Sequence, residues 1–251
     1  MEEGACCTSI CAAMAPFLSL VESVRDGTVE EAIAKLSSED PEVRHAAAFA
    51  LREAVDYRCA DALICCLEDP DPRVRASACI SLGALMPPNA APALASLLSD
   101  PDSHVRAIAA HALGEIRTGF PMRLLVHALA DPDHKVRAFA AIAIGATRRR
   151  SGIRALQARL RDEDPGVRAS AASALGRLLD RGSINALLKG TSDEAVEVRY
   201  EAGRALLAMG RAEGRASLEA ILKTKACPDY MQPRAFRKEV RNALKGWAVA
   251  W

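Results

Sequence analysis

Large rings are scarce in this sequence, because aromatic residues make up only 4% of its 251 positions. Alanine fills 50 positions instead, about one residue in five. Alanine is the best helix former and is depleted in strands, and a core of small aliphatic side chains needs closely spaced elements. The composition therefore disfavours sheet-rich folds and favours helices packed at short distance.

The sequence also lacks the marks of a secreted or membrane protein. It begins with Met1-Glu2-Glu3, which is acidic where a signal peptide is positive, and Glu2 excludes N-myristoylation. The longest apolar stretch near the start, about 10–21, is too short to span a bilayer and contains Pro16. We therefore expect the eight cysteines to lie in a reducing, cytoplasmic environment.

A strong charge of one sign is absent, since 33 Lys/Arg and 32 Asp/Glu give a net charge of +1. This balance argues against a protein that coats nucleic acid. The total nevertheless hides an asymmetry: residues 1–125 hold 10 basic and 18 acidic residues, whereas residues 126–251 hold 23 and 14. We expect an electrical dipole along the sequence.

A Val-Arg dipeptide organises the chain, because it recurs every 31 residues and ends at Arg44, Arg75, Arg106, Arg137, Arg168 and Arg199. An alanine three residues later and a leucine or isoleucine seven residues later keep the same register. Six copies without an insertion indicate a solenoid.

Each unit of this repeat reads as two helices. In the third copy, residues 91–98 have apolar side chains at helical spacing, and residues 99–103 interrupt the pattern. A second helix then begins near His104 and carries a stripe of period 3.6. The aspartates of the interruption supply turn and N-cap chemistry, because their carboxylates accept hydrogen bonds from the free amides of a helix start.

Four of these units resemble HEAT-like repeats of the phycobilisome (PBS) lyase type: they begin with Asp-Pro-Asp or Asp-Glu-Asp-Pro, end with Leu-Gly or Ile-Gly, and cover 69–83, 100–114, 131–145 and 162–176. The resemblance extends over about 29–210 and implies an all-α, right-handed superhelix of about seven helical pairs with terminal caps. Its family includes chromophore lyase subunits, di-iron hydroxylases and binding scaffolds. The His-Glu dipeptides that supply the hydroxylase metal ligands are missing here, which argues against that activity.

Three segments follow from the repeat. Residues 1–28 lack the signature, and we expect a helical cap over the first repeat. Residues 29–210 form six repeats. Residues 211–251 form a capping repeat, in which Val240-Arg241 comes 42 residues after Arg199 and so requires an insertion of 11 residues, around 224–234, before a closing helix over 235–247.

The repeated residues themselves have structural explanations. We interpret the six arginines as one side of an Asp-Arg ladder whose acidic side is Asp71, Asp102, Asp133 and Asp164. The small residues let successive helices approach closely, and larger side chains there would overpack the stack. The glycines late in the second helices, such as Gly83 and Gly176, serve the same purpose and form no phosphate loop.

The varied positions are the candidates for function. The resemblance implies that the second helices line a concave surface, and the non-core positions next to each Val-Arg pair would then face a partner. They give the predicted partner-binding residues His45, Phe49, Ile80, His104, Ile108, His111, His134, Phe139, Ile142, Tyr200 and Arg204. Exposed Phe and Ile favour an apolar groove. The alternative is ordinary packing between neighbouring helices.

A dense basic segment gives a second candidate, a contact to an anionic partner through Arg148, Arg149, Arg150 and Arg154. The alternative is a solvated loop, because no aromatic residue accompanies these arginines for base stacking. We predict no metal and no cofactor, since the histidines have no tight pairing. The cluster Cys6, Cys7 and Cys11 is compatible with zinc, palmitoylation or no role.

The favoured function is a non-catalytic protein-binding scaffold, because no catalytic motif stands out. The residues that recur every 31 positions stay the same from repeat to repeat, whereas the positions next to each Val-Arg pair vary. The alternative, implied by the resemblance, is a phycobilin lyase or lyase-like subunit that holds a linear tetrapyrrole in the same groove. Nucleic-acid binding through 148–161 is the least favoured hypothesis.

Overall fold

The computed structural model describes residues 21–22, 28–53, 56–117, 122–224, 227–228 and 231–248. Most of the predicted N-terminal cap, with Cys6, Cys7 and Cys11, lies outside the described residues. Every regular element in the described ranges is a helix, and none of these helices is long and apolar enough to cross a membrane. The chain divides into two compact units, Met1–Phe120 and Pro121–Trp251.

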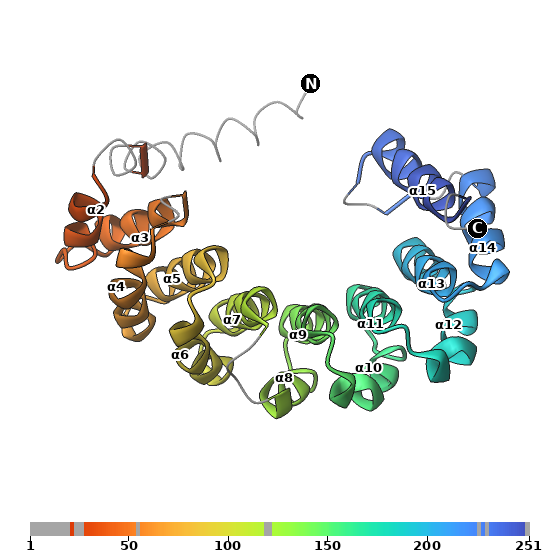
Figure 1. The fold of residues 1–251 in the computed structure, drawn as a ribbon, viewed down its shortest axis with the longest axis horizontal. Coiled ribbons are helices and arrows are strands. Elements are labelled where there is room, and N and C mark those ends of the chain that lie inside the picture. The colour runs from red at the N-terminus through yellow and green to blue at the C-terminus, as the bar shows by residue number, and fades with distance from the viewer. Residues whose placement is uncertain are drawn as a thin grey trace, which may run out of the picture. The chain divides into compact units, whose positions relative to one another are not determined.

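The first unit contains three helical pairs (Figure 1): α2 (Val29–Lys35) with α3 (Pro41–Ala50), α4 (Ala60–Cys65) with α5 (Pro72–Leu85), and α6 (Ala91–Ser96) with α7 (Ser103–Ile116). The second helices pack in order, α3 on α5 and α5 on α7. Short 3₁₀ helices flank these α-helices: η1 (Leu51–Glu53) follows α3, η2 (Tyr57–Cys59) precedes and η3 (Cys66–Glu68) follows α4, and η4 (Pro88–Ala90) precedes and η5 (Leu97–Ser99) follows α6.

The second unit contains four helical pairs: α8 (Met122–Ala128) with α9 (His134–Thr147), α10 (Ile153–Arg159) with α11 (Pro165–Arg177), α12 (Ile184–Gly190) with α13 (Val196–Ala208), and α14 (Ala212–Thr224) with α15 (Pro233–Ala248). The 3₁₀ helices η6 (Arg150–Gly152) and η7 (Arg181–Ser183) precede α10 and α12. The described ranges thus hold seven helical pairs, and the predicted all-α superhelical class is confirmed.

Aspartate caps start most of the second helices, as the sequence predicts. The Asp102 carboxylate accepts hydrogen bonds from the amides of His104 (2.8 Å) and Val105 (3.1 Å), and Asp164 accepts one from the amide of Val167 (3.0 Å). Equivalent caps stand at Asp40, Asp71 and Asp133. Each cap satisfies amides that have no partner inside the helix.

The arginine ladder exists, but its predicted acidic side was wrong. The ion pairs join residues 25 apart, and they are Arg44 with Asp69, Arg75 with Asp100, Arg137 with Asp162, and Arg168 with Asp193. Each arginine therefore binds the first aspartate in the turn of the following repeat. Asp71, Asp102, Asp133 and Asp164 are the second aspartates of their turns, and their carboxylates accept hydrogen bonds from the first amides of the helices that follow.

In each ladder pair the arginine makes two hydrogen bonds to the carboxylate, and both side chains are largely shielded from solvent. Arg137 donates from Nε and Nη2 to the two carboxylate oxygens of Asp162 at 3.0 and 2.8 Å, and the exposed fractions of the two side chains are 7% and 3%. Arg137 also donates to the carbonyls of Asp131 and Pro132. Burial works to raise the pKa of Asp162, but the hydrogen bonds from Arg137 and from the Asp164 amide outweigh it, so the pKa is lowered.

Small residues allow the second helices to pack closely. A Cβ added to Gly176 would lie 2.8 Å from the Cα of Ala205, and one added to Gly83 would lie 3.1 Å from the Cα of Ala112. The leucines and isoleucine of the repeat, such as Leu82 and Ile144, are fully buried between the helices. The abundance of alanine and the scarcity of rings thus follow from the helix spacing.

The last helix departs from a plain repeat. Helix α15 begins at Pro233, two residues before the predicted start, and part of the predicted insertion lies outside the described residues. Phe236 and Val240 of α15 are buried against Val196 and Tyr200 of α13. The closing helix therefore covers apolar surface at the end of the second-helix row.

Candidate functional site

A hollow of about 410 Å³ lies on the second-helix face of the second unit. We call it the inner hollow. It is lined by Ala138 and Ile142 of α9, by Gly166, Ala169, Ser170, Ser173 and Arg177 of α11, by Glu197, Tyr200 and Glu201 of α13, and by Met231, Phe236 and Glu239 of the C-terminal segment. All but one of the lining residues from α9, α11 and α13 stand at the varied positions next to Val-Arg, and the exception is Arg177.

Two serines explain why the hollow exists. Ser170 and Ser173 of α11 stand 31 residues after Phe139 and Ile142 of α9, so small side chains replace large ones at the same register. The neighbouring helices carry large side chains beside this position, Ile142 of α9 on one side and Tyr200 of α13 on the other. The missing volume over α11 leaves the space open.

The far wall of the hollow is an aromatic pair. The rings of Tyr200 and Phe236 meet edge to face, with centroids 5.2 Å apart. Tyr200 is only 8% exposed, because α15 covers much of its ring. The predicted anchor Arg204 is exposed, lies 5.5 Å above the Tyr200 ring and pairs with Glu201 at 3.0 Å. Tyr200 thus contributes mainly as a packed wall, a role that sequence reasoning missed because the contact comes from a distant helix.

The inner hollow is predominantly acidic. Glu197, Glu201 and Glu239 line it, whereas Arg177 is the single cation among the described residues of its lining. Glu201 is partly neutralised by Arg204. The site therefore combines an apolar wall with carboxylates and hydroxyls.

The predicted residues of the first unit lie in different surroundings. His45 is half-buried, with its Nδ1 2.8 Å from Ser77 Oγ and 3.1 Å from the Arg73 carbonyl, and burial lowers its pKa, which favours the neutral ring. Phe49 is half-buried under the Arg52 guanidinium, at 4.8 Å from the ring centroid. Ile80 and Ile108 are also half-buried.

The remaining predicted residues divide by exposure. His104 and His111 are exposed on α7, His134 is exposed at the start of α9, and Phe139 is half-buried on α9. In the ranges that the structure describes, no group of three or more His, Cys, Asp or Glu could hold a metal ion.

The described cysteines do not offer an activated nucleophile in the core. Burial raises the pKa of Cys66 to about 11 and also raises the pKa of the buried Cys79 thiol. Both thiols therefore stay protonated near neutral pH. Their burial matches the core positions that the repeat register predicts.

The basic segment is solvent-exposed, as both of its predicted interpretations require. Arg148, Arg149 and Arg154 are exposed, and Arg150 is exposed while it pairs with the buried Asp180 at 3.3 Å. The segment spans the end of α9, η6 and α10.

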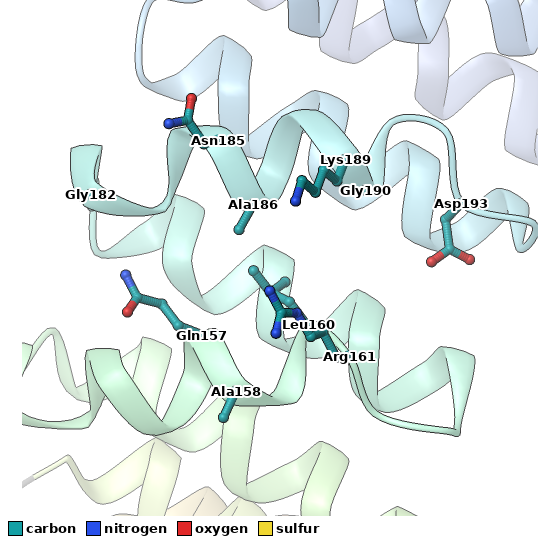
Figure 2. Close-up of a pocket in the computed structure, with 10 residues that line it drawn as sticks. All are labelled: Gln157, Ala158, Leu160, Arg161, Gly182, Asn185, Ala186, Lys189, Gly190 and Asp193. Atoms are coloured by element: carbon teal, nitrogen blue, oxygen red, sulfur yellow. The ribbon is translucent and has the colours of Figure 1, made fainter.

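A second hollow, which the sequence analysis did not single out, lies between the first helices of the same unit (Figure 2). We call it the outer groove. Its volume is about 560 Å³, and its lining comprises Gln157, Ala158, Leu160, Arg161, Gly182, Asn185, Ala186, Lys189, Gly190 and Asp193. The available signal in the sequence was the pair Arg161, just after α10, and Lys189, on α12, beside glycine and alanine residues.

Comparison with known proteins gives the same architecture. A profile of HEAT repeats matches residues 29–114 and 122–206. No curated protein matches the sequence significantly.

Three solved structures illustrate the similarity. The CpcE–CpcF complex of phycocyanin lyase from Nostoc sp. PCC7120 is 23% identical, with a TM-score of 0.61 over 88% of this chain and 95% of that one. The YibA protein of Escherichia coli is 23% identical, with a TM-score of 0.59 over 97% and 89%. A designed armadillo repeat protein in complex with a (KR)4 peptide is 19% identical, with a TM-score of 0.54 over 73% and 100%.

These similarities are at the level of the fold, whereas the repeat profile covers most of the chain in sequence. The chain therefore belongs to the HEAT repeat proteins.

Proposed function

We propose that this protein is a non-catalytic binding scaffold that holds an apolar side chain of a protein partner in the inner hollow. The observation that carries this proposal is the hollow itself, which exists because Ser170 and Ser173 replace the bulky residues of the preceding repeat. The fold needs no such gap, since α9 fills the same positions with Phe139 and Ile142.

The size and lining of the hollow suit such an anchor. A volume of about 410 Å³ lies at the small end of ligand pockets and suits one or two side chains. Ile142, Tyr200, Phe236 and Met231 offer apolar contact, and a side chain buried in a preformed pocket is the usual energetic centre of a protein interface. The surrounding carboxylates would favour a partner segment with basic residues near its apolar anchor.

The first unit carries further residues of the same register. Phe49, Ile80 and Ile108 are half-buried, so part of each side chain is open to contact. Together with His45, His104, His111 and His134, they remain predicted partner contacts.

The test fills the hollow with the residues of the preceding repeat. A double variant Ser170→Phe/Ser173→Ile gives α11 the side chains that α9 already carries, and Ser170→Ala/Ser173→Ala is the matched control that keeps the hollow open. Partners are captured with the wild-type chain, identified by mass spectrometry and titrated against each variant.

The filled variant is expected to bind the partner at least about tenfold more weakly, a loss of about 1.4 kcal/mol. The alanine control is expected to bind like the wild type. Unchanged affinity of every partner for the filled variant, with an intact helical circular dichroism signal, would contradict the inner hollow as the binding site.

A lyase-like subunit is a second candidate, supported by the similarity to the phycocyanin lyase complex over 88% of this chain. A linear tetrapyrrole would then occupy the inner hollow and the face around it. Co-expression with a phycobiliprotein and its bilin tests this candidate, because the absence of both bilin transfer and visible absorption would eliminate it.

A further inference from the structure

The outer groove presents cations from two helices to one space. Figure 2 shows the side chains of Arg161, which follows α10, and of Lys189 on α12 on opposite sides of the gap between these helices. Both side chains belong to exposed residues. Among the described residues, neither has a carboxylate partner. A guanidinium and an ammonium therefore face the same groove with free hydrogen-bond donors.

The carboxylates close to the groove are already engaged. Asp193 binds Arg168 through two hydrogen bonds of 2.9 Å. The buried Asp180 accepts hydrogen bonds from Ser183 at 2.5 Å and from Gln157 at 3.2 Å. Both carboxylates therefore already bind other residues of the second unit, so the cations of the groove stay available to a ligand.

The two cations are not part of the repeat frame. Thirty-one-residue steps align Arg161 with Ser99 and Glu68 in the first unit, and they align Lys189 with Ser96 and Cys65. The same outward positions thus fold without a positive charge. Stacking of the helices does not explain why the second unit carries cations there.

Small residues keep the groove open between the cations. Ala158 and Ala186 stand on the two helices, Gly182 precedes α12 and Gly190 is its last residue. Asn185 lies four residues before Lys189 and therefore on the same face of α12, where its amide adds two more donors.

We propose that the outer groove binds an extended acidic segment of a partner protein, whose carboxylates pair with Arg161 and Lys189. A guanidinium matches a carboxylate with two parallel hydrogen bonds, and the exposed Arg154 on α10 extends the cationic surface beyond a single anion. Nucleic acid fits less well, because the lining contains no aromatic side chain on which a base could stack.

This site is independent of the inner hollow. The groove is built by the first helices and the hollow by the second helices and α15. A variant of one site therefore leaves the lining residues of the other unchanged, and the two proposals can fail separately.

The test uses the full chain and a fluorescein-labelled decaglutamate peptide, with binding followed by fluorescence polarisation at low and at physiological ionic strength. The double variant Arg161→Glu/Lys189→Glu is expected to bind at least about tenfold more weakly than the wild type, because two ion pairs become repulsive contacts. A decalysine peptide is expected not to bind the groove. Both substituted residues are exposed, so the circular dichroism spectrum and the thermal midpoint should stay unchanged.

The matched control is Lys238→Glu/Arg241→Glu on α15, which changes the net charge of the chain by the same amount outside the groove. It is expected to keep the affinity for decaglutamate within about twofold at physiological ionic strength, where distant charges are screened. An equal loss in both double variants would show that net charge alone attracts the peptide, and it would overturn the groove as a site.

Two other occupants would also overturn the proposal. An oligothymidylate of equal length that binds the groove more tightly than decaglutamate would assign it to nucleic acid. Concentration-dependent self-association that the groove variant abolishes, together with no binding of decaglutamate, would assign it to a second copy of the chain.

Discussion

The two units of this protein share one frame, which consists of the repeated capping aspartates, ladder ion pairs and small helix-contact residues. They differ in the charge of the residues outside this frame. Residues 1–120 carry 9 basic and 18 acidic residues, whereas residues 121–251 carry 24 and 14. Arg75 with Asp100 in the first unit and Arg137 with Asp162 in the second make the same bidentate pair. The frame is thus neutral in both units, and the difference lies in residues that the stacking does not use.

The outward side of the first helices shows this difference most plainly. In the first unit, α4 and η3 carry Asp61 and Glu68, whereas in the second unit α10 carries Arg154 and α12 carries Lys189. Substitution at exposed helix positions costs little stability, so these positions can change sign without loss of the fold. Substitutions in the frame should therefore affect both units alike, and substitutions outside it should affect binding in one unit only.

The largest effect should come from breaking the ladder in each unit. Arg75→Ala leaves the nearly buried Asp100 without its cation and is expected to lower the free energy of unfolding by about 3–5 kcal/mol. Arg137→Ala removes the bidentate partner of Asp162 but leaves Arg159 at 3.2 Å, so its loss should lie at the lower end of that range. Urea unfolding followed by circular dichroism measures this loss.

The control for the ladder is Arg73→Ala, which removes a half-exposed arginine paired with Asp71 and Glu42 and should cost at most about 1 kcal/mol. A ladder variant that is as stable as this control would show that the two units do not depend on the same frame.

A smaller effect is expected from the close helix contacts. Gly176→Ala brings a Cβ within 2.8 Å of the Cα of Ala205 and should destabilise the protein by about 1–3 kcal/mol. In Gly83→Ala the corresponding distance is 3.1 Å, so the better helix propensity of alanine, worth about 1 kcal/mol, should offset more of the strain. Thermal and urea unfolding of the two variants would contradict this ranking if Gly176→Ala were the more stable.

The smallest effect should be a difference in pH dependence. Burial lowers the pKa of His45 in the first unit below its ordinary value of about 6.5, so the stability from the neutral ring is full above that pH and is lost as pH falls through the folded pKa. The pKa values of Asp162 and Asp193 in the second unit are also lowered, because hydrogen bonds and charge outweigh desolvation, so their contribution is full above about pH 4 and is lost below it.

The variant His45→Gln removes the weakly acidic titration and should flatten the stability profile just below pH 6.5, with the steeper acid loss retained. Urea unfolding across this pH range measures the profile. An unchanged profile would contradict the assignment of that window to His45.

Much of the fold was predictable, because a 31-residue period repeats local signals. The turn aspartates, the Val-Arg pairs and the small residues are each readable within one copy, and seven copies of a helical pair follow from them. Which of the two aspartates of a turn pairs with the ladder arginine could not be predicted, because the two lie only two residues apart in the sequence. The backbone geometry of the turn places Asp100 against Arg75 and Asp102 at the start of its own helix.

The candidate sites were predictable only in part. The varied positions next to Val-Arg do line the inner hollow, which is readable as the change from Phe139 and Ile142 to two serines. The contact of Phe236 with Tyr200 depends on where α15 packs against α13. The outer groove depends on the packing of two helices whose lining residues are about 30 positions apart.

The sequence by itself determined the repeat, the helical pairs, the caps and the division into frame and varied positions. These features depend on interactions between residues close in the sequence or on a pattern that recurs in every repeat. Only the tertiary structure decided which aspartate each arginine binds, which ring closes the inner hollow and which cations share the outer groove. Those features depend on the distance between side chains of different helices, and that distance is set by packing across the stack, which no single repeat contains.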